Sequence, residues 1–353
     1  MMKHFSFLNG SKLNSNNAKD NDMISRFIPR DLDSKVEDLI CSAPDLCGKR
    51  AILLQKWQEL RGQKLNIMIT GATGCGKSST INALFNMGAA TVTEVAKVGV
   101  GVDPETMDIT KYEIGNMVLW DSPGLGDGKN ADLRHSKNII DKLLERDENG
   151  KLLIDLVLVI LDGSTRDLGT SFELINKVII PNLGDNKEQR ILVAINQADV
   201  AMKGRNWDYK NNCPEAALVT YLEEKCMSVR RRVYEGTGVD IDPIYYCAGY
   251  KEEGQEQGRP YNLAKLLYFI LMHIPAEKRL VAAMNANQDA EMWQDNDSKD
   301  YGEKIRHSLE DAIGTSLKAA ALGAAVGSVF GPVGTAVGTV AGALVGFFGS
   351  FFG

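Results

Sequence analysis

Paired cysteines, an excess of positive charge and an apolar leader are all missing from this 353-residue sequence. The six cysteines form no CxxC pair and have no metal-ligand spacing, so we expect reduced thiols rather than disulfides or structural zinc. The formal net charge of −6 disfavours a broad nucleic-acid surface. Residues 1–17 contain no apolar run long enough for a signal peptide. These absences favour a cytoplasmic protein with one large domain and accessory segments.

A glycine-rich stretch, Gly71-Ala72-Thr73-Gly74-Cys75-Gly76-Lys77-Ser78, lies between an apolar run at 65–70 and a helical pattern at 78–85. This spacing and context are typical of a Walker A phosphate-binding loop. Glycines let backbone N–H groups face one concavity, and the N-terminus of the following helix adds positive potential. We therefore expect Lys77 to bridge the outer phosphates and Ser78 to hold Mg²⁺, with Ser79 in the same site. The thiol of Cys75 is either oxidation-sensitive or simply small enough to fit the loop.

A Gly- and Val-rich segment, 88–104, follows at the place of a mobile switch. The next threonine, Thr106, can donate its backbone N–H to the γ-phosphate and bind Mg²⁺ through its hydroxyl. Thr91, Thr93 and Thr110 are the alternatives for this role.

Two strand patterns, 108–114 and 117–120, are joined by a tight turn at Gly115-Asn116. The second is followed by Asp121-Ser122-Pro123-Gly124, a DxxG sequence. Asp121 can hold Mg²⁺ through water, and the Gly124 N–H can sense the γ-phosphate, whose loss would release both loops. Residues 126–132 are predicted to form a second flexible switch.

Two further apolar runs, 155–161 and 191–195, are typical of central parallel strands. The second ends in Asn196-Gln197-Ala198-Asp199, where a carboxylate can accept two hydrogen bonds from the N1–H and exocyclic amine of guanine, a pair of donors that adenine does not offer. A wrong base would leave it unpaired at a cost of ~1–3 kcal/mol. A last strand pattern, 243–246, precedes Cys247-Ala248, and the Ala248 N–H can contact the base oxygen. The alternative is that Asn196 and Asp199 only cap the end of a strand.

Five stretches resemble, in the same order, the five motifs of P-loop GTPases, over roughly residues 64–274. They are 71–78, Thr106, 121–124, 196–199 and 247–248. The sequences GCGKSSTINALF and WDSPGLGDG resemble those of the Era-like bacterial branch, in particular the YfjP/YkfA-type GTPases. They are more distantly similar to those of septins and immunity-related GTPases. The resemblance implies an α/β fold with a mostly parallel sheet and helices on both faces. It also implies GTP or GDP with Mg²⁺ as ligands, Lys77, Thr106 and Gly124 as the residues of GTP hydrolysis, and a G-domain dimer or higher oligomer.

Three positions depart from that family pattern. Gln197 stands where the base-stacking lysine is usual, and Cys247 replaces the usual serine, so we expect modest nucleotide affinity. Leu125 stands where Ras-type enzymes carry the water-orienting glutamine, so we expect slow intrinsic hydrolysis. Asp127, or a residue of a second G domain, is the candidate to complete catalysis.

The flanking segments differ in composition from the G domain, predicted at 63–275. Residues 1–30 are polar and aperiodic and are expected to be disordered. Residues 31–62 carry helical patterns and form either a brace on the G domain or an arm for a partner. Residues 276–318 are charged and helical in pattern, and we expect a stalk.

The C-terminal segment, 319–353, has no ionisable side chain and carries nine glycines at steps of four and three. It exceeds the ~20 apolar residues of a membrane span, and Gly331-Pro332 divides it into the two arms of a hairpin. Its glycines fall on one helical face, as in GxxxG packing. We expect a glycine zipper that inserts into a membrane or self-associates; the alternatives are a hairpin buried on the G domain and a flexible linker.

Together these patterns predict a GTP-binding, slowly hydrolysing switch that controls its glycine zipper, located in the cytoplasm and peripheral to, or inserted in, the inner membrane. One alternative is a soluble GTPase associated with ribosomes or RNA. The other is a membrane-disrupting effector with a regulatory G domain.

Overall fold

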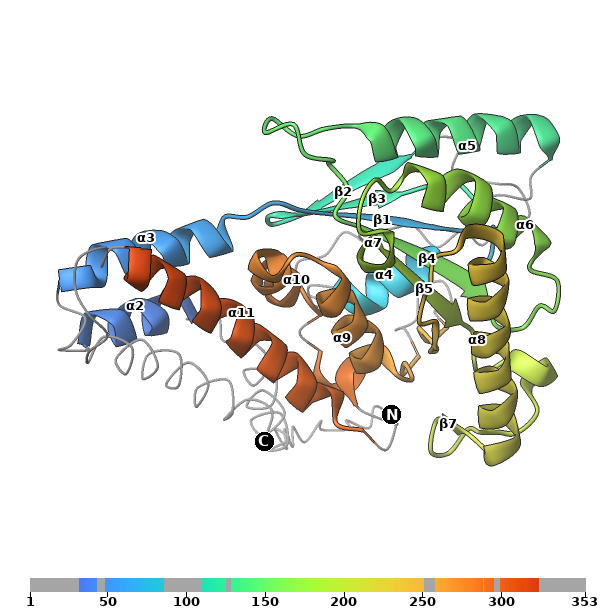
Figure 1. Ribbon diagram of the computed structural model, residues 1–353. Helices are drawn as coiled ribbons and strands as arrows, with labels where there is room; N and C mark the ends of the chain where they lie inside the picture. The colour runs from blue at the N-terminus through green and yellow to red at the C-terminus, as the bar shows by residue number, and fades with distance from the viewer. Residues whose placement is uncertain are drawn as a thin grey trace, which may run out of the picture.

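A six-stranded sheet forms the centre of the part of the chain that the computed structural model describes, residues 32–42, 48–85, 109–124, 128–250, 258–287, 289–294 and 299–323 (Figure 1). Its strand order is β2-β3-β1-β4-β5-β8. All neighbouring strands are parallel except β2 and β3, which form an antiparallel hairpin. The strands are β1 (Leu65–Gly71), β2 (Thr110–Ile114), β3 (Met117–Asp121), β4 (Leu156–Asp162), β5 (Ile191–Asn196) and β8 (Ile244–Tyr245). The predicted mostly parallel α/β sheet is confirmed.

Helices cover both faces of this sheet, because its central strands alternate apolar side chains between two cores (Figure 1). Ile67 and Ile69 of β1 face one core and Met68 faces the other. The first core is closed by α4 (Lys77–Phe85), α9 (Leu263–His273), α10 (Arg279–Met284), η6 (Ala290–Trp293) and α11 (Tyr301–Gly323). The second is closed by α5 (Lys129–Leu144), α6 (Gly169–Glu173), η2 (Leu174–Ile179), η3 (Ile180–Asn182) and α8 (Ala216–Thr237).

Short elements complete the connections. They are α7 (Lys187–Arg190), η4 (Ala201–Gly204), η5 (Ala276–Lys278) and the small hairpin of β6 (Trp207–Asp208) and β7 (Cys213–Pro214). The segment predicted as a second switch, 126–132, is partly helical, since Lys129–Asp132 form the first turn of α5 with Asp132 at its positive end. The first switch, with Thr106, and residues 125–127 lie outside the described residues, as does the lead at 1–30.

The flanking helices pack on the nucleotide domain. α2 (Leu32–Ser42) contacts α3 (Arg50–Arg61), and α3 contacts α10 and α11. Residues 276–318, expected as a stalk, do not project from it. Ile305 and Leu309 of α11 are buried in the same core as β1, because they form an apolar stripe at helical spacing among the charged residues of this segment. How the chain divides into domains stays a prediction.

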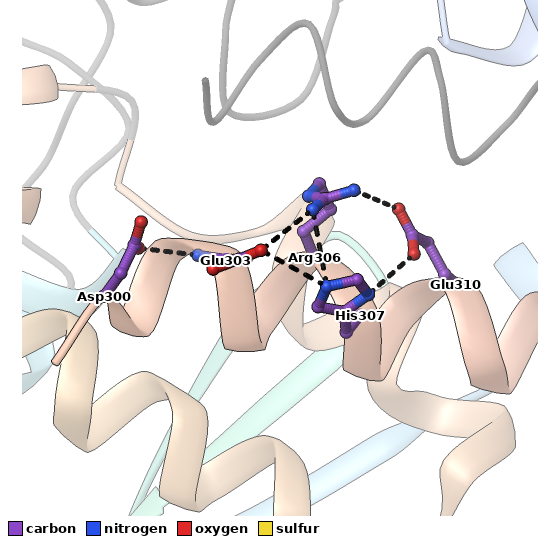
Figure 2. Close-up of polar contacts among 5 residues, drawn as sticks. All are labelled: Asp300, Glu303, Arg306, His307 and Glu310. Atoms are coloured by element: carbon purple, nitrogen blue, oxygen red, sulfur yellow. Dashed lines mark hydrogen bonds and ion pairs between the residues drawn. The ribbon is translucent and has the colours of Figure 1, made fainter.

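A polar cluster lies along α11 (Figure 2). The Arg306 guanidinium contacts Glu303 at 3.5 Å and Glu310 at 3.0 Å. His307 contacts the same two carboxylates through its two ring nitrogens, at 3.5 and 3.1 Å. The Glu303 N–H donates to Asp300 at the start of the helix. Glu310 is only 7% exposed, so its charge is compensated by Arg306 rather than by water.

The predicted glycine zipper, 319–353, lies outside the described residues except for its first five, which continue α11 without a break to Gly323. The predicted boundary at 318 therefore falls inside one helix. Within the ranges that the structure describes, no helix is both long and apolar enough to cross a membrane.

Candidate functional site

The carboxyl ends of β1, β3, β4 and β5 meet at one edge of the sheet, and the loops that follow them carry most of the predicted site residues. Gly71, Asp121 and Asn196 are the last residues of β1, β3 and β5, and the rest of the glycine loop, of the DxxG loop and of the stretch 196–199 follows directly. Cys247 and Ala248 come two residues after the edge strand β8. The structure thus brings the described predicted residues to one side of the sheet.

Backbone geometry explains the glycines of the loop. Gly71, Gly74 and Gly76 have φ angles of 151°, 80° and 90°, a region that side chains disfavour. A Cβ on Gly71 would collide with the Ile160 carbonyl oxygen on β4, and one on Gly76 with the Asn196 side chain. Only glycine lets the loop lie this close to β4 and to Asn196.

The Cys75 side chain is fully buried beneath the loop. Burial raises the pKa of its thiol, so the reactive thiolate is disfavoured. This environment favours the interpretation that Cys75 is a small side chain that fits, and it disfavours a redox role.

Lys77 is the first residue of α4. Its Nζ donates to the carbonyl oxygens of Gly71 at 3.3 Å and Ala72 at 3.4 Å, so the ammonium lies over the start of the loop. Ser78 and Ser79 follow in the first turn and are half-buried, and the helix starts there with N–H groups that have no partner within the helix. Loop, ammonium and helix N-terminus form a positive concavity suited to phosphate oxygens.

Asp121 ends β3 and is 5% exposed. Its Oδ1 is buried without a hydrogen-bond partner among the described residues. Burial raises the pKa of this carboxyl to about 6, although the positive charge of Lys77 opposes the shift. An unsatisfied buried carboxylate oxygen is a group that a hydrated divalent cation would stabilise, so the site fits Mg²⁺. Ser78 and Asp121 would hold it; Thr106, the third predicted ligand, lies outside the described residues.

The DxxG loop is anchored at two points. The Ser122 hydroxyl donates to Thr70 Oγ1 at 2.7 Å, and its N–H donates to the Ile69 carbonyl on β1. Gly124 packs so closely on Thr73 that a Cβ at Gly124 would collide with the Thr73 backbone. Gly124, predicted to sense the γ-phosphate, therefore lies directly against the glycine loop.

Asn196 connects three loops. Its Nδ2 donates to the Cys75 carbonyl in the glycine loop at 3.0 Å, and its Oδ1 accepts from the Ala248 N–H at 3.0 Å. Its own carbonyl accepts from the Gly163 N–H after β4. Because the side chain is buried and both of its polar atoms are satisfied, Asn196 fixes the phosphate loop and the Ala248 loop in one geometry.

Gln197 adopts a left-handed conformation, with φ of 60°, and its Nε2 donates to the Gly74 carbonyl at 2.9 Å. The amide that replaces the usual lysine is therefore tied to the rim of the glycine loop.

Asp199 is half-buried, and its Oδ1 accepts the Cys247 thiol at 3.0 Å. Burial, with the charge of Asp199, raises the pKa of Cys247, so the thiol stays protonated and is the donor of this bond. Cys247 thus orients the Asp199 carboxylate, as a serine hydroxyl in its place would.

Two residues of this edge have no motif that marks them. The buried ring of His135 on α5 lies with Nδ1 3.1 Å from the Gly124 carbonyl oxygen. Lys225 on α8 donates to three carbonyls of the loop after β4, those of Asp162, Gly163 and Thr165. Neither contact follows from local sequence, because the partners lie 11 and about 60 residues away.

A glycine loop between β1 and α4, a DxxG loop after an antiparallel hairpin and an Asn-x-x-Asp loop after β5 define the α/β fold of P-loop GTPases. The sequence model of the family Interferon-inducible GTPase (IIGP) matches residues 47–135. The chain is 32% identical over 157 residues to the tRNA modification GTPase MnmE of Pelagibacter ubique, covering 44% of this chain and 31% of that protein. It is 30% identical over 153 residues to the uncharacterized protein YfjP of Escherichia coli, covering 42% and 47%.

Among solved structures, Era of Aquifex aeolicus bound to GDP·AlF₄⁻ shares 17% identity at a TM-score of 0.35, over 60% of this chain and 57% of that one. The chain spans less than half the length of the curated relatives named above. It is thus similar to P-loop GTPases of the IIGP, MnmE and YfjP type. The predicted resemblance to P-loop GTPases is confirmed, while a place in the Era-like branch stays a prediction.

Proposed function

We propose that this chain binds GTP and GDP with Mg²⁺ and hydrolyses GTP slowly. The observation that carries the proposal is the pair of hydrogen bonds by which Asn196 joins the loop around Lys77 to the loop of Ala248. A nucleotide can then contact both loops at once, with its phosphates on the glycine loop and its base against Asp199. The relatives named GTPases support the same reaction.

Base recognition rests on Asp199. Its carboxylate is held by the Cys247 thiol, which leaves acceptor capacity for the N1–H and exocyclic amine of guanine. The Ala248 N–H, predicted to contact the base oxygen, instead donates to Asn196 Oδ1 at 3.0 Å, so base recognition depends on Asp199. Adenine offers no matching donors, so the site should reject ATP.

Slow turnover follows from Leu125. The aliphatic side chain of Leu125 cannot hydrogen-bond the attacking water, so Lys77, Gly124 and Thr106 would stabilise the transition state without a water-positioning group at that position. Asp127 or a residue of a second G domain would then complete catalysis, and turnover per molecule should rise with protein concentration if the second domain supplies it.

The test is calorimetry of the full chain with Mg²⁺ and GTP, GDP or ATP, with phosphate release measured in parallel. We expect heat with both guanine nucleotides, none with ATP, and loss of GTP binding in Lys77→Ala. Absence of heat with guanine nucleotides, or equal binding of ATP, would overturn the proposal.

A second proposal concerns the C-terminal segment, 319–353: nucleotide state controls whether it inserts into a membrane or self-associates. A physical route supports it. Asn287 in the loop after α10 donates to the Ala83 and Leu84 carbonyls at the end of α4, so the helix that starts at Lys77 is tied to the layer containing α11. α11 continues into this segment.

Flotation of the full chain with anionic liposomes, in GDP and in a non-hydrolysable GTP analogue, tests this coupling. We expect flotation in one nucleotide state only. In fractionated cells, we expect the protein in both the cytoplasmic and the inner-membrane fractions. Equal flotation in both states, or none, contradicts it, and co-sedimentation with ribosomes would favour the soluble alternative. Lysis of the vesicles without GTP turnover would favour the membrane-disrupting effector.

A further inference from the structure

His135 lies on the second turn of α5 and is 1% exposed. Its Nδ1 is 3.1 Å from the Gly124 carbonyl oxygen. A carbonyl can only accept, so Nδ1 must carry the hydrogen. In the neutral ring Nε2 is then an acceptor, and it is buried without a partner among the residues that the structure describes. A buried polar atom without a partner lowers stability. Packing alone therefore does not explain why a histidine, rather than an apolar residue, stands at this position.

Gly124 is held from the opposite side by the phosphate loop. A Cβ at this position would collide with Thr73, and the preceding loop is fixed to β1 through Ser122 and Thr70. His135 contacts the other end of this glycine, its carbonyl oxygen. The orientation of this carbonyl is coupled directly to α5.

We propose that His135 is a positioning residue of the γ-phosphate sensor: its Nδ1–H holds the Gly124 carbonyl so that the Gly124 N–H faces the phosphate loop. The inference rests on the proposed GTP binding and assigns to one side chain the preference for triphosphate over diphosphate. Because the ring belongs to α5, movement of Gly124 on loss of the γ-phosphate also reaches that helix.

Differential affinity separates this role from a structural one. A ring needed only for packing would change the binding of GDP and of GTP equally, through stability. A ring that orients the sensor glycine changes only the binding of nucleotides with a γ-phosphate, because GDP makes no contact with Gly124 through that group.

The experiment measures dissociation constants of GDP and of a non-hydrolysable GTP analogue by calorimetry on the full chain with Mg²⁺. His135→Phe and His135→Leu fill the buried position with an apolar side chain and remove the Nδ1–H donor. His135→Asn places an amide N–H at the same number of bonds from the backbone as Nδ1. His273→Phe is the matched control, since His273 Nδ1 also contacts a backbone carbonyl, that of Phe269 at 2.7 Å, within α9.

We expect the donor-free variants to lower the preference for the GTP analogue over GDP about fivefold, as loss of one hydrogen bond implies. His135→Asn and His273→Phe should keep the wild-type preference. The proposal is overturned if the variants weaken both nucleotides equally, if the preference does not change, or if His135→Asn behaves as His135→Phe. Wild-type protein that binds neither nucleotide would instead refute the proposed function.

A measurement on the wild type avoids any effect of substitution on folding. Ring ¹⁵N NMR of His135 should show a hydrogen on Nδ1, and its Nδ1 signal should differ between the GDP and GTP-analogue complexes. A hydrogen on Nε2 alone, or identical spectra in both complexes, would overturn the inference.

Discussion

The side-chain Nδ2 of Asn287 lies 2.9 Å from the Ala83 carbonyl oxygen, at the last turn of the helix that begins with Lys77. The Asn287 N–H donates to the neighbouring Leu84 carbonyl at 2.7 Å, and the Trp293 indole donates to the Asn287 carbonyl at 2.6 Å. A residue 204 positions away thus supplies partners for carbonyls that a helix end leaves unpaired.

Asn287→Ala should therefore lower the free energy of unfolding by about 1–3 kcal/mol, since a buried carbonyl loses its donor. We expect hydrogen exchange at the end of α4 to accelerate. Asn285→Ala is the control: Asn285 also donates to a buried carbonyl, that of Val281, but within α10, so it should destabilise without affecting α4 selectively. Unchanged exchange at residues 83–85 in Asn287→Ala would refute this role.

Asp121→Asn should stabilise the nucleotide-free protein at neutral pH. Burial raises the pKa of Asp121 from 3.8 to about 6, so between these values the folded state holds a proton that the unfolded chain releases, and stability falls as the pH rises. Above pH 6, the raised pKa of Asp121 lowers the free energy of unfolding by about 3 kcal/mol. Urea unfolding of the variant should give a higher free energy than wild type at pH 7 and a similar one at pH 4.

The same substitution should abolish the stabilisation that Mg²⁺ adds to bound nucleotide, because a carboxylate ligand is lost. Asp208→Asn, at a half-buried aspartate of β6, serves as the control and should bind Mg·GDP as wild type does. A variant less stable than wild type at pH 7 would show that the Asp121 carboxylate is satisfied in solution.

Asp199→Asn should move base preference from guanine to xanthine, since an acceptor is replaced by a group that can donate. We expect GTP affinity to fall about 10- to 100-fold, and XTP to bind more tightly than GTP. Competition against a fluorescent nucleotide measures the ratio. Undiminished GTP preference would place base recognition elsewhere.

Arg306→Met should destabilise the C-terminal layer by about 2–4 kcal/mol, because the nearly buried Glu310 would lose its guanidinium partner. Arg231→Met is the matched control, since Arg231 and Glu235 form an exposed pair at the same i,i+4 spacing, 4.0 Å apart. An exposed pair of this kind adds less than about 1 kcal/mol to stability. Thermal or urea unfolding compares the two, and equal effects would mean that Glu310 is solvated.

The sequence predicted those parts of the site whose residues lie close together in the chain and next to a recognisable strand. Gly71 to Ser78 require a fixed spacing next to a buried strand, and Asp199 follows another such strand, so periodicity and motif were sufficient. The two bonds of Asn196 reach across 121 and 52 residues, and no local pattern encodes them. No motif marks His135, whose contact with Gly124 depends on how α5 packs.

The C-terminal layer illustrates a second limit. Its charges suggested a solvated stalk, yet Ile305 and Leu309 form a buried stripe among them. Amphipathic helices of this kind look alike whether they cover a neighbouring core or stand alone, and only the tertiary contacts with α3 and α9 decide between the two.

The continuity of α11 past Lys318 has a mechanical meaning. Its 23 residues form a rod of about 34 Å, whose buried side chains run from Ile305 and Leu309 on to Ile313 and Leu317. A helix held along most of its length moves together with the core on which it packs, so a displacement of that core is carried directly to Gly323, where the glycine-rich sequence begins.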